Sequence, residues 1–256
     1  MTIQYASDLH LEFSENKRCL RQNPLIVSGD ILLLAGDISV LSRPDVFPHH
    51  FFDWCDTHYS HTLIVPGNHE FYGGYDLEPT LHGTEIKQTS RVRYLCNKSI
   101  VLGDTEFFFT TLWAPVQERD FSTVEQIMTD CRRIRIDGRL FSAADYAPAH
   151  YRCLLWLKTA LLTSSATHKV VVTHHCPISA EDPRYAGNGA SGAFIAPLED
   201  FIATSDIDYW IFGHTHYNAP RGTIVGRTTL LCNQMGYLST ARGGEPGFRL
   251  DASFTL

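Results

Sequence analysis

Short runs of aliphatic and aromatic residues recur along the chain, and five of them stop at aspartate, asparagine or histidine. Continuous apolar runs of this length predict strands of a sheet that is covered on both faces. Open α/β sheets bind their ligands at the carboxyl ends of such strands. We therefore expect the polar residues after these runs to meet at one site. The five runs are residues 3–6, 31–35, 63–66, 169–173 and 209–212.

The polar residues after the five runs carry carboxylate, amide or imidazole groups. Because extended residues two apart point to the same side of a strand, Asp8 and His10 are expected to face one ion together. The whole candidate ligand set is Asp8, His10, Asp37, Asn68, His174, His214 and His216.

The remaining pattern predicts further helices and strands around these five. Helical spacing predicts helices over 45–59, 78–89, near 121–133, 149–164 and 197–204. β-rich runs predict strands over 92–96, 100–102, 106–113, 223–225, 228–232 and 248–254, with Gly103-Asp104 turning a hairpin. This alternation indicates one α/β domain over 1–256, in which about 114–148 and 178–196 are lid-like insertions.

Composition narrows the class of protein. A chain of 256 residues with 44% hydrophobic residues is long enough for one sizeable core. A net charge of -7 without a basic patch disfavours nucleic acid as a partner. Neither a signal sequence nor a long apolar span is evident, which predicts a soluble, cytoplasmic protein without a membrane partner. The seven scattered cysteines contain no Cys-x-x-Cys pair and are expected to be reduced. The oligomeric state stays open.

The ligand types favour transition metals over other cofactors. Carboxylate with imidazole suits Mn, Fe, Zn, Ni or Co, and the strand ends offer no thiolate for a structural zinc. Two such divalent or trivalent ions sharing a ligand lower the pKa of a bridging water toward ~7. The resulting hydroxide would attack a phosphate ester in line, without a protein nucleophile. His69 is then expected to protonate the leaving oxygen or to hydrogen-bond the transition state.

The motifs, taken in order, resemble those of the calcineurin-like metallophosphoesterase superfamily. They are Asp-x-His at 8–10, Gly-Asp at 36–37, Gly-Asn-His-Glu at 67–70, His174 at a strand end, and Gly-His-x-His at 213–216. The resemblance implies a four-layer α/β/β/α sandwich of two mixed sheets flanked by helices. It also implies that Asp37 bridges the ions and that His69 is the catalytic histidine. One ion would take Asp8, His10, Asp37 and His216, and the other Asp37, Asn68, His174 and His214.

Several positions leave alternatives. Only one of the adjacent His174 and His175 is expected to be a ligand, and His174 is favoured because it lies nearer the strand. His175 would then contact substrate or pack. Arg132 and Arg135 are candidate contacts to a substrate phosphate, against the alternative of a solvated face. Asn68 and His69 are further candidates, and Glu70 is expected to orient its loop.

Three functions are compatible with these residues. The first is a dinuclear-metal phosphoesterase acting on phosphomonoesters or phosphodiesters. A non-catalytic, metal-binding protein-interaction module of the same fold is the alternative, and the intact ligand set with His69 argues against it. A single-metal hydrolase of another ester would require Asn68 or His174 to be spare.

Overall fold

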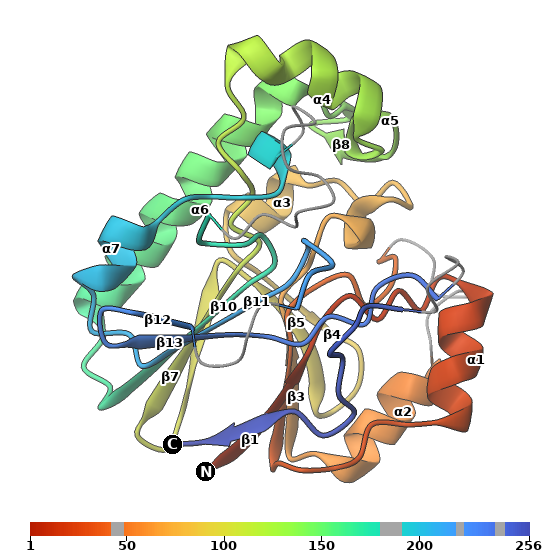
Figure 1. Cartoon of the computed structure of the whole chain (residues 1–256), viewed down its shortest axis with the longest axis vertical. Helices are drawn as coiled ribbons and strands as arrows, with labels where there is room; N and C mark the ends of the chain where they lie inside the picture. The colour runs from red at the N-terminus through yellow and green to blue at the C-terminus, as the bar shows by residue number, and fades with distance from the viewer. Residues whose placement is uncertain (42–48, 180–190, 219–222, 239–243) are drawn as a thin grey trace.

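Within residues 1–41, 49–179, 191–218, 223–238 and 244–256, which the computed structural model describes, the chain forms two six-stranded mixed sheets (Figure 1). The first sheet has the order β14 (Ser253–Thr255), β1 (Thr2–Ala6), β2 (Ile31–Leu34), β3 (His61–Ile64), β5 (Val92–Cys96) and β4 (Thr84–Lys87). The second has the order β12 (Thr223–Val225), β13 (Thr228–Cys232), β11 (Tyr209–Phe212), β10 (His168–Thr173), β7 (Thr105–Thr110) and β6 (Lys98–Leu102).

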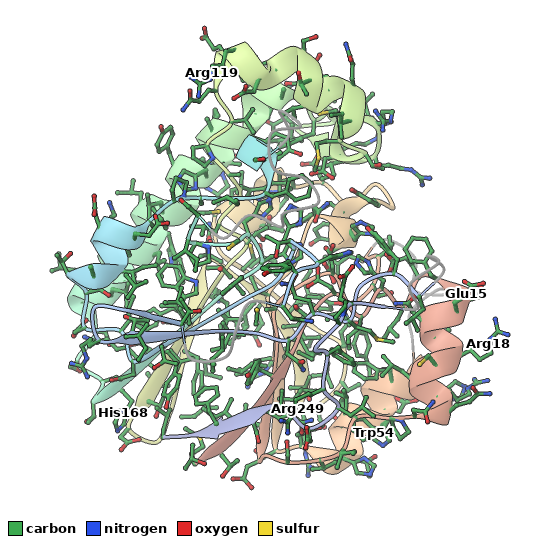
Figure 2. The ribbon with its side chains drawn as sticks, viewed as in Figure 1. Glu15, Arg18, Trp54, Arg119, His168 and Arg249 are labelled. Carbon is green, nitrogen blue, oxygen red and sulfur yellow. The ribbon has the colours of Figure 1, made fainter. Side chains whose placement is uncertain are left out.

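Helices cover the outer face of each sheet. Helices α1 (Ser14–Gln22) and α2 (His49–His58) lie on the first sheet, and α6 (Ala143–Thr163) and α7 (Glu199–Ala203) on the second. Successive side chains of a strand point to opposite faces, so Leu32 and Leu34 pack under α1 and α2 while Leu33 faces the other sheet. Polar residues of α1 such as Glu15 and Arg18 project away from the sheets (Figure 2). The four-layer α/β/β/α sandwich that the resemblance implied is confirmed.

The five strands that end at polar residues run in the same direction within each sheet. Strands β1, β2 and β3 pair in parallel, with Ala6 beside Leu34 and Leu34 beside Ile64. In the second sheet β10 and β11 pair in parallel, with Val172 beside Ile211. The loops that follow these strands therefore leave their sheets at the carboxyl edges.

Some predicted elements are wrong or differ in extent. The helix predicted over 78–89 is instead α3 (Glu78–Leu81) followed by β4, because Gly83 with φ of 93° ends the helix and 84–87 pairs with β5. Helix α6 begins at Ala143, earlier than predicted, since Ser142 and Asp145 form a capping box. The pattern did not predict α1, whose sequence is mostly polar. The hairpin of β6 and β7 is confirmed.

The two segments predicted as insertions are described to different extents. Residues 114–148 contain η2 (Glu118–Asp120), α4 (Phe121–Ile127), α5 (Asp130–Arg133), the hairpin β8 (Arg135–Ile136) and β9 (Arg139–Leu140), and the start of α6. They contribute to a buried cluster that includes Trp113, and they lie at the end of the molecule away from the termini (Figure 1). In the second segment, 178–196, residues 180–190 lie outside the described part of the chain. The described remainder of this segment contains η3 (Ser191–Ala193). Residues 45–48 of the helix predicted over 45–59 likewise lie outside the described part.

All seven cysteines are free thiols. Among the described residues, no helix combines the length and the apolar character that crossing a bilayer requires.

Candidate metal centre

The loops after the parallel strands hold their polar residues in a strained backbone conformation. Among the described residues, nine non-glycine residues have positive φ, and five of these belong to the candidate ligand set. Left-handed backbone costs a non-glycine residue on the order of 1 kcal/mol or more, and such residues cluster at functional sites. The five residues and their φ values are Asp8 (55°), His10 (47°), Asp37 (55°), His214 (72°) and His216 (47°).

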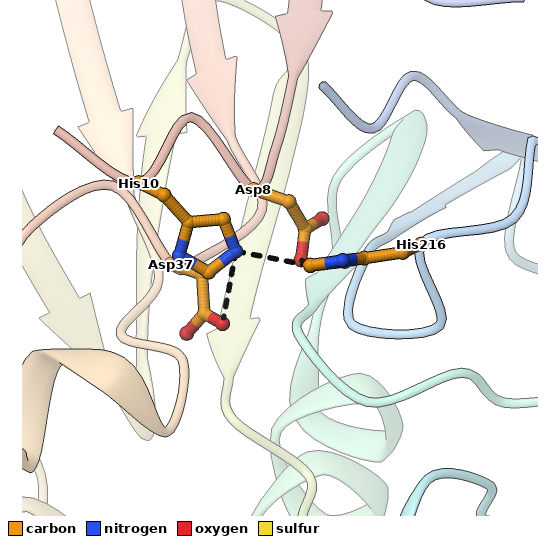
Figure 3. Close-up of side chains that lie close together, drawn as sticks. All are labelled: Asp8, His10, Asp37 and His216. Carbon is orange, nitrogen blue, oxygen red and sulfur yellow. Dashed lines mark hydrogen bonds and ion pairs between the residues drawn. The ribbon is translucent and has the colours of Figure 1, made fainter. Parts of the chain in front are cut away.

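A first group of potential ligands consists of Asp8, His10, Asp37 and His216 (Figure 3). Nε2 of His10 lies 3.0 Å from Nε2 of His216. Nε2 of His216 is also 3.2 Å from Oδ1 of Asp8, and Nε2 of His10 is 3.8 Å from Oδ2 of Asp37. Two imidazoles and two carboxylates thus turn their ligand atoms to one point in a largely buried space.

A second group consists of Asp37, His174 and His214, beside Asn68. His174 donates its Nδ1 proton to the Ala35 carbonyl at 2.8 Å, which directs Nε2 into the group. That Nε2 lies 3.3 Å from Oδ1 of Asp37 and 3.1 Å from Oδ1 of Asn68. Nε2 of His214 is buried without a hydrogen-bond partner among the described residues. Buried polar atoms normally have partners, so this nitrogen fits a site that binds a cation.

Asp37 is the residue common to the two groups. Its Oδ2 faces His10 of the first group, and its Oδ1 faces His174 of the second. The backbone amide of His69 also donates to Oδ1 at 2.9 Å, which fixes the carboxylate. This geometry suits a carboxylate that bridges two ions.

The structure separates the adjacent histidines after β10. His174 lies in the second group, whereas Nδ1 of His175 is 3.2 Å from the Thr111 carbonyl oxygen and its ring packs against Trp113. Burial, together with His174, lowers the pKa of His175 well below its usual range. His175 is therefore a packed neutral ring beside the second group.

Two glycines of the motifs allow the loops to approach the ligand side chains. A Cβ atom added at Gly67 would collide with Asp37 Oδ1 and with the His174 ring. A Cβ added at Gly213 would lie 2.6 Å from Oδ2 of Asp8 and 2.8 Å from Oγ of Ser7. Contacts this short are not tolerated, so both positions require glycine for close packing.

Glu70 ties the loops after β2 and β3 together. Its buried carboxylate accepts hydrogen bonds from the backbone amides of Asp37 at 2.9 Å, Ile38 at 2.8 Å and Gly67 at 2.7 Å. This is the loop-orienting arrangement that we expected for Glu70, and it places Asp37 relative to Asn68.

His69 lies at the edge of the first group and has two polar partners. Its Nδ1 is 2.7 Å from Oε1 of Glu12, and its Nε2 is 3.0 Å from the hydroxyl of Tyr237. Burial lowers the pKa of His69, but Asp37 and Glu12 outweigh burial and raise it to about 9. Burial also opposes ionisation of Glu12, but His10 and His69 lower the pKa of Glu12 to about 2.

Sequence reasoning missed Glu12, Tyr237 and Asp130. Glu12 continues the two-residue spacing of Asp8 and His10, and this spacing is a signal that could have found it. Tyr237 comes from the loop after β13, and Asp130 comes from α5 and accepts a hydrogen bond from Asn68. Neither residue has a local signal.

Arg132 and Arg135, the predicted contacts to a substrate phosphate, make no hydrogen bond or ion pair with the two groups of potential ligands among the described residues. Arg132 and Arg135 are exposed, and each donates to backbone carbonyls of its own segment. Arg132 binds the carbonyls of Glu125 and Gln126 at 3.2 and 3.3 Å, and Arg135 binds that of Gly138 at 3.0 Å. The solvated-face alternative describes them better.

Comparison with known proteins places the chain in a family. The family model Metallophos, described as calcineurin-like phosphoesterase, matches residues 1–218, and the chain belongs to this family. "Uncharacterized protein L509" of Acanthamoeba polyphaga mimivirus is 25% identical, covering 97% of this chain and 96% of that protein.

Solved structures share the fold at lower identity. The phosphopantetheinyl hydrolase PptH of Mycobacterium tuberculosis aligns with a TM-score of 0.65 and 17% identity, over 92% of this chain and 89% of that one. A dimetal phosphatase of Danio rerio aligns with a TM-score of 0.44 and 14% identity, over 91% and 87% of the two chains. The first of these supports the two-sheet fold described above.

Proposed function

We propose that this chain is a phosphoesterase that holds two transition-metal ions and hydrolyses phosphomonoesters or phosphodiesters. The observation that carries the proposal is Asp37, whose two carboxylate oxygens face two separate groups of ligand atoms. Imidazole, carboxylate and amide donors fit Mn, Fe, Zn, Ni or Co, and the unpartnered Nε2 of His214 is accounted for by an ion.

The residues divide into two ligand sets in this proposal. Asp8, His10, Asp37 and His216 hold one ion, and Asp37, Asn68, His174 and His214 hold the other. Ions bound there supply an activated water for in-line attack on phosphorus and neutralise the phosphate oxygens. The protein contributes a rigid cage, because Glu70 and the glycines fix the loops that carry the ligands.

His69 is the proposed proton donor to the leaving oxygen. Because the Nδ1–H group donates a hydrogen bond to Glu12, Nε2 is the atom that exchanges a proton with substrate. Nε2 lies 3.9 Å from Oδ2 of Asp37, on the side where the proposed ion ligands converge. The hydroxyl of Tyr237, 3.0 Å from Nε2, lies at the same point and can contact the same substrate oxygen.

The competing functions fit less well. A non-catalytic binding module does not require an imidazole that a carboxylate orients beside the ion ligands, as Glu12 orients His69. A single-metal hydrolase requires that Asn68 or His174 is not a metal ligand. Oδ1 of Asn68 instead lies 3.1 Å from Nε2 of His174, on the side facing Asp37.

The test is hydrolysis by stripped and reloaded protein. The purified chain is treated with a chelator, reloaded with one metal at a time, and assayed with p-nitrophenyl phosphate and bis(p-nitrophenyl) phosphate. We expect hydrolysis to fall to background on stripping and to return on reloading, and the ratio of the two rates gives the ester class. Full hydrolysis by the stripped chain contradicts the proposal. Uptake of metal without hydrolysis of either ester favours the binding module.

A further inference from the structure

We propose that Asp130 of α5 is a positioning residue that fixes the orientation of the Asn68 side chain. Because Asp130 belongs to the segment 114–148, the affinity for the second ion depends on this segment. The inference rests on the proposed function, because it concerns the ion held by Asp37, Asn68, His174 and His214. It assigns to that segment a part in ion binding beyond covering the site.

Asp130 is a fully buried carboxylate that no step of the proposed reaction uses. Its Oδ1 accepts hydrogen bonds from Nδ2 of Asn68 at 2.8 Å and from the hydroxyl of Tyr72 at 2.5 Å. Its Oδ2 accepts one from the hydroxyl of Tyr146 at 2.5 Å. Burying a carboxylate is unfavourable unless its oxygens are well bonded, and here three neutral donors satisfy them. The two tyrosine hydroxyls thus hold the Asp130 carboxylate where it accepts a hydrogen bond from Asn68.

The Asn68 amide has both of its hydrogens on the Asp130 side. Nδ2 donates to Asp130 and, at 3.0 Å, to the hydroxyl of Tyr72. Oδ1 is consequently turned to the other side, where it lies 3.1 Å from Nε2 of His174.

The flipped amide would set an oxygen against the carboxylate of Asp130. Amide oxygen and nitrogen are nearly equal in size, so hydrogen bonding decides between the two orientations. Only the orientation that Asp130 selects offers an oxygen to a cation.

Asp130 is held by the packing of the segment 114–148. Helix α5 joins the cluster formed by Trp113, Ile134, Phe141 and Tyr146, and Tyr146 of α6 binds the second oxygen of Asp130. Displacement of α5 would therefore remove the acceptor from Asn68. Because coupling is reciprocal, binding of the second ion should in turn stabilise α5 in its docked position.

The first experiment measures ion affinity. Mn²⁺ is titrated into the stripped full-length chain by calorimetry, and bound metal is counted by mass spectrometry. We expect Asp130→Ala to weaken the second ion about 10- to 100-fold and to leave the first unchanged. Asp130→Leu, which fills the space with an apolar group, covers the case in which the alanine variant fails to fold. Tyr146→Phe is the matched control, since it removes a donor to Asp130 but keeps the bond to Asn68.

A double-mutant cycle separates positioning from a general structural role. If Asp130 acts through Asn68, Asp130→Ala should have no further effect on the second ion in an Asn68→Ala background. If Asp130→Ala weakens the affinity for the second ion by the same factor in the wild-type and the Asn68→Ala backgrounds, the inference is overturned. Wild-type affinity in both Asp130 variants would overturn it as well. These readouts do not need hydrolysis. A wild-type chain that binds no second ion contradicts the proposed function as well.

Hydrogen exchange tests the reciprocal coupling. We expect amides of residues 121–141 to exchange more slowly when Mn²⁺ fills the second group, and the slowing to disappear in Asp130→Ala. Amides of α1, on the outer face of the first sheet, serve as the internal reference. Equal slowing in the wild type and in Asp130→Ala would contradict the coupling.

Discussion

Oε1 of Glu12 lies 2.7 Å from Nδ1 of His69 and 3.1 Å from Nδ1 of His10. One carboxylate thus orients two imidazole rings, whose Nε2 atoms lie 3.9 and 3.8 Å from Oδ2 of Asp37. A carboxylate that accepts one ring N–H of a histidine fixes the direction of the other nitrogen. Glu12 therefore links the proposed proton donor to a proposed ion ligand.

Glu12→Gln keeps the shape of the side chain but removes one of its acceptor oxygens and its charge. We expect kcat to fall about 10- to 100-fold, because neither ring is then held as firmly. Steady-state kinetics on an aryl phosphate measure the change. Glu15→Gln on the exposed face of α1 is the control and should match the wild type. An unchanged kcat in Glu12→Gln would remove Glu12 from the account.

His69→Ala removes the proposed proton donor but no proposed ion ligand. We expect the chain to keep both ions and to lose about 10²- to 10⁴-fold in kcat for esters with poor leaving groups. The loss should be smaller for p-nitrophenyl esters, whose leaving oxygen needs little protonation. A series of aryl phosphates of rising leaving-group pKa measures the trend. Loss of metal, or the same loss for every ester, would show that the role given to His69 is wrong.

Gly67→Ala places a methyl group against Asp37 and His174. Overpacking of this kind destabilises a protein by about 1–3 kcal/mol, and here the atoms displaced are proposed ligands. We expect a lower Tm and weaker binding of the second ion, measured by thermal unfolding and metal titration. Gly192→Ala is the control, because its Cβ would lie 3.7 Å from Asp120, an ordinary contact. Wild-type metal affinity in Gly67→Ala would contradict the close packing described here.

Asp145→Ala removes the capping box of α6 and the ion pair with Arg139. Loss of such a cap costs about 1 kcal/mol and should lower Tm by about 2–4 °C. Burial raises the pKa of Asp145, but Arg139 and Ser142 outweigh burial and lower it overall.

Because the folded pKa of Asp145 is lowered, its carboxylate stabilises the fold above the ordinary aspartate pKa of ~3.9. That contribution is lost as pH falls through the lower folded value. The difference in Tm between the wild type and Asp145→Ala should therefore be constant from pH 7 to about 5 and narrow below about 4. Thermal unfolding across this range measures it. A difference that grows on acidification would contradict the assignment.

Sequence reasoning located the candidate ligands because each of them follows one of five strands. A buried parallel strand has a local signal, and strands that are parallel bring their ends to one edge, as β1 and β2 do for Asp8 and Asp37. Asp130 could not be found this way, since it contacts Asn68 across 62 residues of sequence and depends on how α5 packs.

Two errors in the elements have local physical reasons. Residues 84–87 continue the weak helical pattern of 78–81, but pairing with β5 and the turn at Gly83 make them a strand. The helix predicted over 149–164 begins directly after Pro148. The capping box at Ser142 instead starts α6 upstream, and the helix accommodates the proline.

Counting the metal bound by the wild type and by Asp37→Asn tests the central claim most directly. Asp37 is the residue that the two proposed sites share, so its carboxylate should be required for both ions. We expect about two transition-metal ions per wild-type chain, and loss of both metal and hydrolysis in Asp37→Asn. A wild-type chain without metal, or an Asp37→Asn chain that keeps two ions and full activity, would contradict it.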